Sequence, residues 1–110
     1  MLMSLNKLLQ TASIFAALGD ETRLSLLNRL SSDGPLSITR LTEGAGVSRQ
    51  AITRHLDVLQ SAGIAVSRRE GRERVWAMDP RKLKTARRSL EEISARWDAA
   101  LERLRQLVEA

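Results

Sequence analysis

The sequence predicts a mainly helical domain with one small β-hairpin, and three observations support this prediction. Apolar residues repeat at helical spacing over most of the chain, and cap residues and glycines mark the helix ends. Residues 64–78 instead alternate apolar and polar side chains on either side of a turn at 69–72. A length of 110 residues suits one domain with a single core. The expected order over residues 1–110 is therefore four helices, two strands and a final helix.

The first two helices, within residues 4–32, are expected to build the core. The first has leucines at mixed three- and four-residue spacings, and such a wide apolar side needs more than one neighbour. Gly19 breaks this helix, and Asp20 is placed to cap the next one. Leucines then repeat every three residues from Leu24 to Leu30. We interpret both helices as structural elements without chemistry.

Residues 37–62 are expected to form two helices joined by a glycine-rich turn at 44–46. Ser37 and Ser48 are N-caps, because a serine hydroxyl can accept a hydrogen bond from an unpaired amide of the first turn. Gly63 supplies the left-handed residue that commonly ends a helix. This pattern indicates a helix-turn-helix, whose second helix enters the DNA major groove. An ordinary helical hairpin in a small bundle has the same turn chemistry and remains the alternative on these residues alone.

The second of these helices, residues 48–61, has one apolar face and one polar face. Ile52, Leu56 and Leu59 share the apolar face, which we predict to be buried. On the polar face, glutamine can pair with adenine, arginine with guanine, and the threonine methyl group with thymine. For the single histidine, a structural role on the helix flank is the alternative to a phosphate contact. We assign base-edge contacts to Gln50, Thr53 and Arg54, and phosphate or positioning contacts to Ser48, Arg49 and His55.

The hairpin at 64–78 follows this helix directly, which is the position of a wing. Four arginines crowd near its tip and would repel one another unless a polyanion or solvent lay beside them. Guanidinium groups suit a narrow minor groove or the flanking phosphates. We interpret Trp76 and Met78 as core residues. The predicted wing contacts to DNA are Arg68, Arg69, Arg72 and Arg74.

The net charge of +5 is concentrated in the middle of the chain. Residues 47–88 hold eleven basic and four acidic side chains, whereas the preceding residues are balanced and the following ones are net acidic. A positive block beside a helix-turn-helix is typical of a phosphate-binding surface. A solvated basic face is the alternative explanation of the charge taken alone.

A last helix is expected over 80–109, opened by Asp79 as the cap and Pro80 at its favoured first position. Its apolar residues follow a nearly heptad spacing. At about 45 Å such a helix is longer than so small a core can cover. A two-fold dimer would cover its far end and present two recognition helices to a palindromic site, whereas a helix that frays at its tip is the alternative. The predicted dimer interface contains Leu5, Leu8, Leu9, Leu90, Ile93, Trp97, Leu101, Leu104 and Val108.

Composition excludes several other classes of protein. The chain has no cysteine, which rules out disulfides and thiolate metal sites. It has neither a signal-peptide pattern nor an apolar run of 18 residues, so we expect a cytoplasmic protein that contacts no membrane. A single histidine on the expected DNA-facing helix and no nucleotide-cradling glycine loop argue against an enzyme. We predict no cofactor.

Taken together, these stretches resemble the ArsR-type family of dimeric winged-helix transcriptional repressors, over nearly the whole chain. Glu21 stands where that family usually has proline. The resemblance implies a dimer made by the first and last helices, and repression by occupying a promoter, often the regulator's own. The stretches that carry it are 17–24, 36–41, 48–56, 59–64 and 71–76.

Many members of the family sense metals through cysteines or through aspartate and histidines on the last helix. This chain has no cysteine and no histidine in its last helix, so we predict a metal-independent member with no metal site and an unknown inducing signal. The rival function is a winged-helix adaptor that binds proteins and no longer binds DNA. The arginines of the recognition helix and wing argue against that rival.

Overall fold

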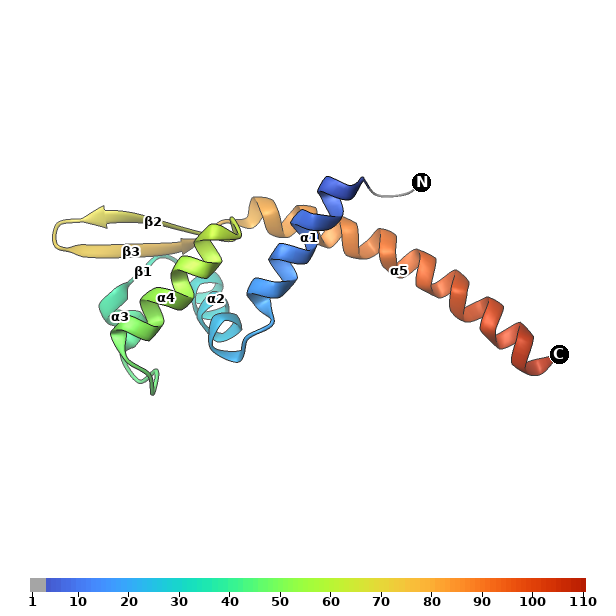
Figure 1. Cartoon of the computed structure of the whole chain (residues 1–110). Helices are drawn as coiled ribbons and strands as arrows, with labels where there is room; N and C mark the ends of the chain where they lie inside the picture. Colours follow the sequence, from blue (N-terminus) through green and yellow to red (C-terminus); the bar gives the residue numbers. More distant parts are fainter. Residues whose placement is uncertain (1–3) are drawn as a thin grey trace.

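The computed structural model describes residues 4–110 and confirms the predicted mainly helical fold with a small sheet (Figure 1). The described part is elongated, with principal extents of 65 × 28 × 21 Å. The hairpin lies at one end of the long axis and the C-terminal end of the last helix at the other. In chain order the elements are α1 (Leu5–Leu18), α2 (Glu21–Asp33), β1 (Leu36–Ser37), α3 (Ile38–Thr42), α4 (Arg49–Ser61), β2 (Ala65–Glu70), β3 (Glu73–Met78) and α5 (Pro80–Glu109).

The predicted helix caps are all formed. Asp20, Ser37, Ser48 and Asp79 each accept a hydrogen bond from a backbone amide two or three residues later, at 3.0–3.1 Å. Each cap satisfies an amide that the helix itself leaves without a partner. Gly63 has a φ of +80°, which confirms the left-handed residue expected after α4. Local chemistry therefore determines where the helices begin and where α4 ends.

The sheet has three strands in the order β1-β3-β2, one more than the sequence predicts. The additional strand forms because the extended residue after Pro35 lies beside β3, where Leu36 pairs with Trp76. The hairpin is also longer than expected, since Glu70 still pairs with Glu73 and only two residues form its turn. Gly71, the first of them, has a φ of +62°. Strand pairing therefore reaches almost to the tip of the wing.

The core lies where α2, α3 and α4 meet the base of the sheet, and α1 and the first half of α5 add residues to it. The predicted buried face of α4 is confirmed, because Ile52, Leu56 and Leu59 are fully buried. Trp76 is also buried, at 1% exposure, and Met78 packs against the same cluster. The expected position of Leu24 is wrong, since it is 45% exposed. Its α2 neighbours Leu26, Leu27 and Leu30 occupy the buried face instead, because a helix turns only one face toward the core.

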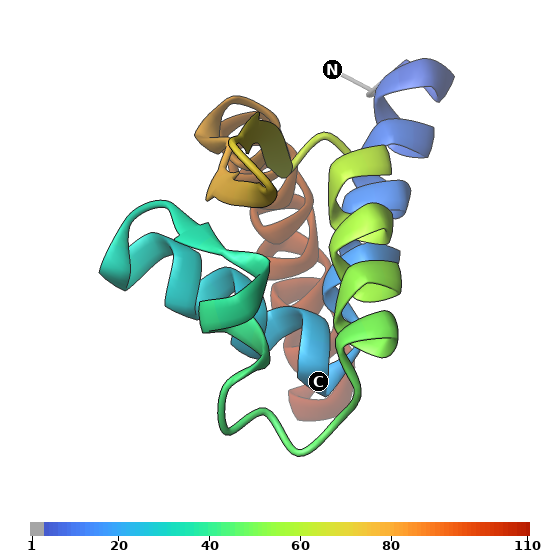
Figure 2. The same cartoon turned by 90° about the vertical axis from the view of Figure 1, so that its left-hand side faces the viewer.

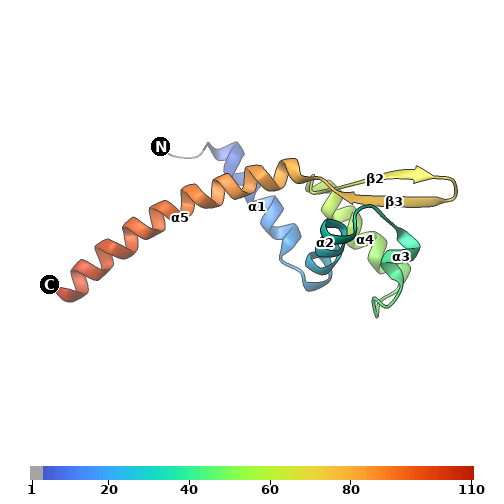
Figure 3. The ribbon, with the colours of Figure 1, turned by 180° about the vertical axis from the view of Figure 1, so that it is seen from behind.

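Only the first half of α5 packs on its own chain. Ala86 and Ser89 are buried, and α1 is the helix that crosses this part of α5 (Figures 1 and 3). Beyond this crossing α5 continues away from the other elements to its C-terminal end. No helix within residues 4–110 is long and apolar enough to cross a membrane.

The cap of α5 makes a pH-dependent contribution to stability. Hydrogen bonds from the side chain and the backbone of Arg81 lower the pKa of Asp79 from 3.8 to about 2. Since the pKa is lower in the folded state, this contribution is present above the unfolded value and disappears as the pH falls through the folded value. We therefore expect the free energy of unfolding to decrease between pH 3.8 and about 2. Asp79→Asn keeps a capping oxygen but should show a smaller decrease.

Urea unfolding at a series of pH values measures this effect. The control is Asp98→Asn, which removes an exposed carboxylate from the same helix and should keep the pH dependence of the wild-type protein. If the free energy of unfolding changed with pH to the same extent in the wild type and in Asp79→Asn, the assigned role of Asp79 would be contradicted.

Candidate nucleic-acid interface

The polar face of α4 contains the residues expected to read base edges. Gln50 and Arg54 are exposed, and neither side chain makes a hydrogen bond or ion pair with another residue of the described chain. Thr53 donates its hydroxyl to the Arg49 carbonyl at 3.0 Å, which leaves its methyl group for contact. Ser48 accepts from the Ala51 amide at 3.1 Å and remains exposed at the start of the helix. These side chains are thus available to an external partner.

Arg49 has a partner that the sequence did not reveal. Its Nη2 lies 3.4 Å from Oε1 of Glu73 in β3. The same carboxylate accepts from Thr39 Oγ1, at 2.9 Å to Oε1 and 2.7 Å to Oε2. No local pattern connects these residues, because Glu73 is 34 positions from Thr39 and 24 from Arg49. Only the folded chain brings them together.

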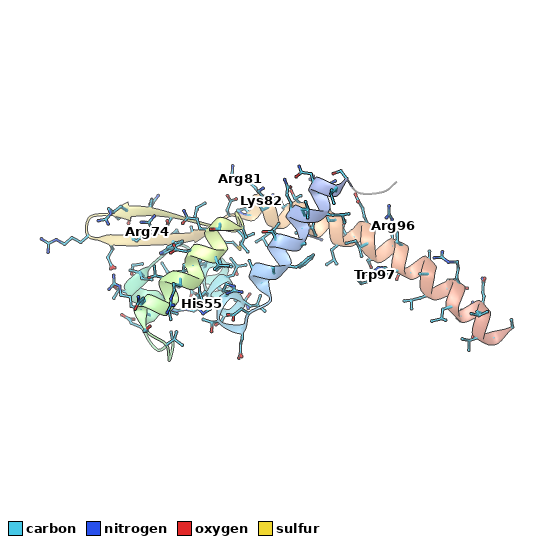
Figure 4. All side chains as sticks on the ribbon, viewed as in Figure 1. His55, Arg74, Arg81, Lys82, Arg96 and Trp97 are labelled. Atoms are coloured by element: carbon cyan, nitrogen blue, oxygen red, sulfur yellow. The ribbon has the colours of Figure 1, made fainter. Side chains whose placement is uncertain are left out.

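His55 lies on the side of α4 that faces α2 (Figure 4). Its side chain is 25% exposed, and Nδ1 lies 3.3 Å from Nη1 of Arg23 and 3.7 Å from Oδ2 of Asp20. The hydrogen bond from the Arg23 amide is the main reason that the pKa of Asp20 is lowered, and the charge of Arg23 adds to this effect. These contacts favour the structural role of His55 over a phosphate contact.

Arg23 connects three helices. Its Nε donates to the Ala17 carbonyl at 2.6 Å, and Nη2 donates to the Ala16 carbonyl at 3.4 Å. Both carbonyls belong to the last turn of α1, where the Ala16 carbonyl also accepts from the Gly19 amide at 3.3 Å and the helix offers the Ala17 carbonyl no amide of its own. Because Arg23 also contacts His55, it joins α1 and α2 to the recognition helix. No local pattern in the sequence predicts this role, although Arg23 lies within a stretch that resembles the family.

The four wing arginines have different surroundings. The side chains of Arg69 and Arg72 are exposed and have no hydrogen-bond or ion-pair partner in the described chain. Arg68 pairs with Glu70 of the same strand, with Nη2 2.6 Å from Oε1. Arg74 (Figure 4) instead donates from Nε to Ser67 Oγ at 2.9 Å, and its guanidinium carbon lies 5.7 Å from the centre of the Trp76 ring.

Arg74 also takes part in a contact between the wing and α4. Ser67, which accepts from Arg74, donates its hydroxyl to Gln60 Oε1 at 2.9 Å. Arg74 thereby links β3 to the C-terminal half of α4 rather than extending from the tip. Three of the four predicted wing contacts remain well placed for an external polyanion.

The first turn of α4 and the tip of the hairpin lie at the same end of the molecule. Figure 1 shows this end opposite to the C-terminal end of α5, and Figure 2 views the molecule from this end. We call it the basic end and define it by Ser48, Arg49, Gln50, Thr53, Arg54, Arg68, Arg69 and Arg72. The contact between Arg49 and Glu73 confirms that α4 and the wing are neighbours there. Within residues 4–110, no cluster of three or more histidine, cysteine, aspartate or glutamate side chains could hold a metal ion.

The predicted dimer interface forms an exposed apolar strip on α5. At 100° per residue its members fall within roughly 80° around the helix. Trp97, for example, is 64% exposed and projects from α5 into solvent (Figure 4). We call Leu90, Ile93, Trp97, Leu101, Leu104 and Val108 the α5 strip; Ile93 is half-buried and the others are 46–74% exposed.

The α1 residues of the predicted interface are exposed as well. Leu5, Leu8 and Leu9 have exposed fractions of 71%, 43% and 61%. Leu107, at 75%, is a further exposed apolar residue that the sequence did not indicate, because it falls outside the nearly heptad spacing. The described chain thus leaves a continuous apolar face of α5 without a covering element.

A helix-turn-helix followed by an arginine-bearing hairpin defines the winged helix-turn-helix class of DNA-binding proteins. Residues 18–68 match the family described as a helix-turn-helix domain. The HTH-type transcriptional regulator Rv2034 of Mycobacterium tuberculosis is 36% identical over 94 residues, which cover 86% of this chain and 84% of that protein. An ArsR-like transcriptional regulator from Rhodococcus sp. RHA1 has a similar structure, with 38% identity, a TM-score of 0.79 and coverage of 94% of this chain and 96% of that one. This chain belongs to the ArsR-type family of winged helix-turn-helix transcriptional regulators.

A third relative is the arsenical resistance operon repressor of Escherichia coli. It is 33% identical over 67 residues, which cover 61% of this chain and 57% of that protein. All three proteins are named as regulators or repressors of transcription, which confirms the prediction that this chain is not an enzyme. The chain is a DNA-binding regulator of transcription.

Proposed function

We propose that the protein is a homodimeric repressor that binds a palindromic operator through its basic end. The observation that carries this proposal is that the start of α4 and the tip of the wing lie at one end of the molecule. On these elements the side chains of Gln50, Arg54, Arg69 and Arg72 are exposed and have no partner in the described chain. Such side chains are satisfied only by water in the free protein, and DNA offers base edges and phosphates in its place. α4 would enter the major groove and the wing would contact the backbone or minor groove.

The roles of the individual residues follow from their contacts. Gln50, Thr53 and Arg54 read base edges, whereas Ser48, Arg49, Arg68, Arg69 and Arg72 contact phosphates or the minor groove. We assign His55 and Arg74 to positioning, because each is engaged with a neighbouring element. From the sequence, Arg74 is expected to contact DNA, whereas this assignment gives it a positioning role instead. Of the two roles left open for His55, we propose the structural one.

A homodimer is supported by the exposed apolar face of α5 together with Leu5, Leu8 and Leu9 of α1. Monomeric proteins rarely expose a long contiguous apolar surface, so a second copy is the simplest partner for it. A two-fold axis through this face would present two recognition helices to half-sites about 34–36 Å apart, or a multiple of that spacing. The palindromic operator is inferred from this symmetry.

Metal independence is proposed from the side chains available. The chain has no cysteine, and its single histidine is held between Asp20 and Arg23. Thiolate coordination is therefore impossible, and one imidazole does not by itself make a metal site. The protein would act on its own or a neighbouring operon, and its inducer is of a different kind from a thiophilic metal.

The test is a binding titration with DNA from upstream of the protein's own gene, beside a scrambled duplex, at several salt concentrations and with a chelator present. We expect tight, sequence-dependent binding that persists in the chelator and weakens linearly on a log–log plot against salt. Failure to bind once the chelator is added would refute metal independence. Absence of binding to any genomic duplex would favour the adaptor function.

The wing assignment predicts a change in salt dependence. Arg72→Ala removes a guanidinium from the hairpin turn without straining it, since no residue other than glycine has a positive φ in the described chain. We expect weaker operator binding and a salt slope that is smaller by about 0.9 for each phosphate that Arg72 neutralises. Arg103→Ala removes the same charge from the exposed far half of α5 and is the control. An unchanged slope for Arg72→Ala would exclude the wing from the interface.

A further inference from the structure

The carboxylate of Glu73 lies within the basic end, among the arginines that are expected to bind DNA. Glu73 opens β3, and its side chain is 34% exposed. A negative charge at a DNA-binding surface opposes binding, because it repels the phosphates that the surface attracts. A carboxylate at this position therefore needs a compensating role, and the contacts of Glu73 with other elements indicate one.

Glu73 joins three elements that are separate in the sequence. Thr39 Oγ1, in the first turn of α3, donates to both carboxylate oxygens, at 2.9 and 2.7 Å. Arg49 Nη2, at the first residue of α4, is 3.4 Å from Oε1. Both helices of the helix-turn-helix are thus fastened to the first residue of the second wing strand. We call Thr39, Arg49 and Glu73 the wing clamp.

Glu70 provides the comparison within the same hairpin. It pairs directly with Glu73 across the strands, so two carboxylates face each other where like charges are unfavourable. The arginine that offsets Glu70 is Arg68, two residues away on the same strand. Glu70 has no hydrogen bond or ion pair with α3 or α4 in the described chain. Its charge therefore makes contacts only within the wing.

We propose that Glu73 is a positioning and specificity residue for DNA binding. It sets the position of the wing relative to the recognition helix, and it holds Arg49 until a phosphate takes the place of the carboxylate. This inference rests on the proposed function. A wing held in place before binding loses less conformational freedom on the operator, where α4 and the wing must engage together.

The same carboxylate also lowers binding to unrelated DNA. On such DNA the wing and α4 cannot both make favourable contacts. The repulsion between the Glu73 carboxylate and the phosphates is then not offset by those contacts. Discrimination between partners often uses such an unfavourable group as well as favourable ones. Glu73 therefore raises the ratio of operator affinity to non-specific affinity, even though its charge opposes DNA binding.

The experiment is a double-mutant cycle of Thr39→Val and Glu73→Gln in the full chain, with Glu70→Gln as the matched control. Affinities are measured for the operator and for a scrambled duplex at the same salt concentration. Both glutamine variants should bind the scrambled duplex more tightly, because both remove a charge from the wing. Only Glu73→Gln and Thr39→Val should lower the specificity ratio, by about tenfold each. Thr39→Val removes the hydrogen-bond donor, and Glu73→Gln removes one of the two acceptor oxygens together with the charge that holds Arg49.

The two clamp substitutions should not be additive, because both act on the same interaction. Thr39→Val keeps every charge, so a lower ratio in this variant cannot come from electrostatics at a distance. A ratio in Glu73→Gln equal to that in Glu70→Gln, or a fully additive double variant, would overturn the proposal.

A second readout needs no DNA. Amide hydrogen exchange of the hairpin residues 70–74 should be faster in Glu73→Gln and Thr39→Val than in Glu70→Gln, since only the first two release the wing. Equal exchange rates in all three variants would refute the clamp whatever the DNA result. A wild-type protein that binds no duplex with sequence preference would instead refute the proposed function, so the two failures are distinguishable.

Discussion

Replacing Leu101 with glutamate is expected to leave the protein folded but monomeric, and to lower its affinity for the operator by about 10²- to 10⁴-fold. Leu101 is 61% exposed in the single chain, so the new carboxylate stays in water when the protein is monomeric. In the proposed dimer it would be buried in an apolar interface without a partner, which is strongly unfavourable. A monomer has only one recognition helix. It therefore binds one half-site and loses the gain in affinity that comes from binding two linked half-sites.

The control for this variant is Ala99→Glu. It introduces the same side chain only two residues away, but roughly 160° around the helix from Leu101 and outside the α5 strip. Analytical ultracentrifugation measures the mass of each variant, and thermal unfolding checks that both are folded. A dimeric Leu101→Glu protein with wild-type operator affinity would show that α5 is not the interface.

Replacing Arg54 with alanine is expected to remove most of the sequence preference of DNA binding. Arg54 is exposed on the polar face of α4, beyond the first turn, and no residue of the described chain holds its guanidinium. A bidentate arginine contact to guanine contributes about 1–3 kcal/mol. Both protomers of a dimer lose it, so the operator affinity should fall by about 2–6 kcal/mol if the half-sites are independent. Binding to a scrambled duplex should fall much less.

Arg103→Ala separates this loss from a general effect of charge. It removes one arginine per protomer from α5 and should leave the ratio of operator to scrambled binding unchanged. Fluorescence anisotropy with both duplexes, at a fixed salt concentration, gives the two affinities for each variant. An equal decrease on both duplexes in Arg54→Ala would reassign Arg54 from base reading to phosphate contact.

Local signals in the sequence were sufficient for the helices and their ends. Ser37, Ser48, Asp20 and Asp79 cap the helices as expected, because a cap requires only a short polar side chain a few residues from the amides that it satisfies. Periodicity placed Ile52, Leu56 and Leu59 on a buried face, since a regular helix converts spacing into direction. The exposed polar residues of α4 followed from the same geometry.

Contacts between elements could not be predicted in this way. β1 is a strand only because β3 lies beside it, and Leu24 is exposed because its neighbours on α2 occupy the side that faces the core. The arginines of the wing look equivalent in the sequence, yet Arg74 turns to Ser67 and Trp76 while Arg69 and Arg72 have no partner in the described chain.

The sequence by itself determined the order and extent of the helices, the site of the wing and the side chains proposed to read DNA, because these depend on spacing and chemistry over a few residues. The tertiary structure alone decided which of those side chains are free to act. It placed His55 against Arg23, and Glu73 between Thr39 and Arg49. The physical reason is that hydrogen bonds and ion pairs act over a few ångströms, and only the packing of the elements brings residues 24 to 34 positions apart within that distance.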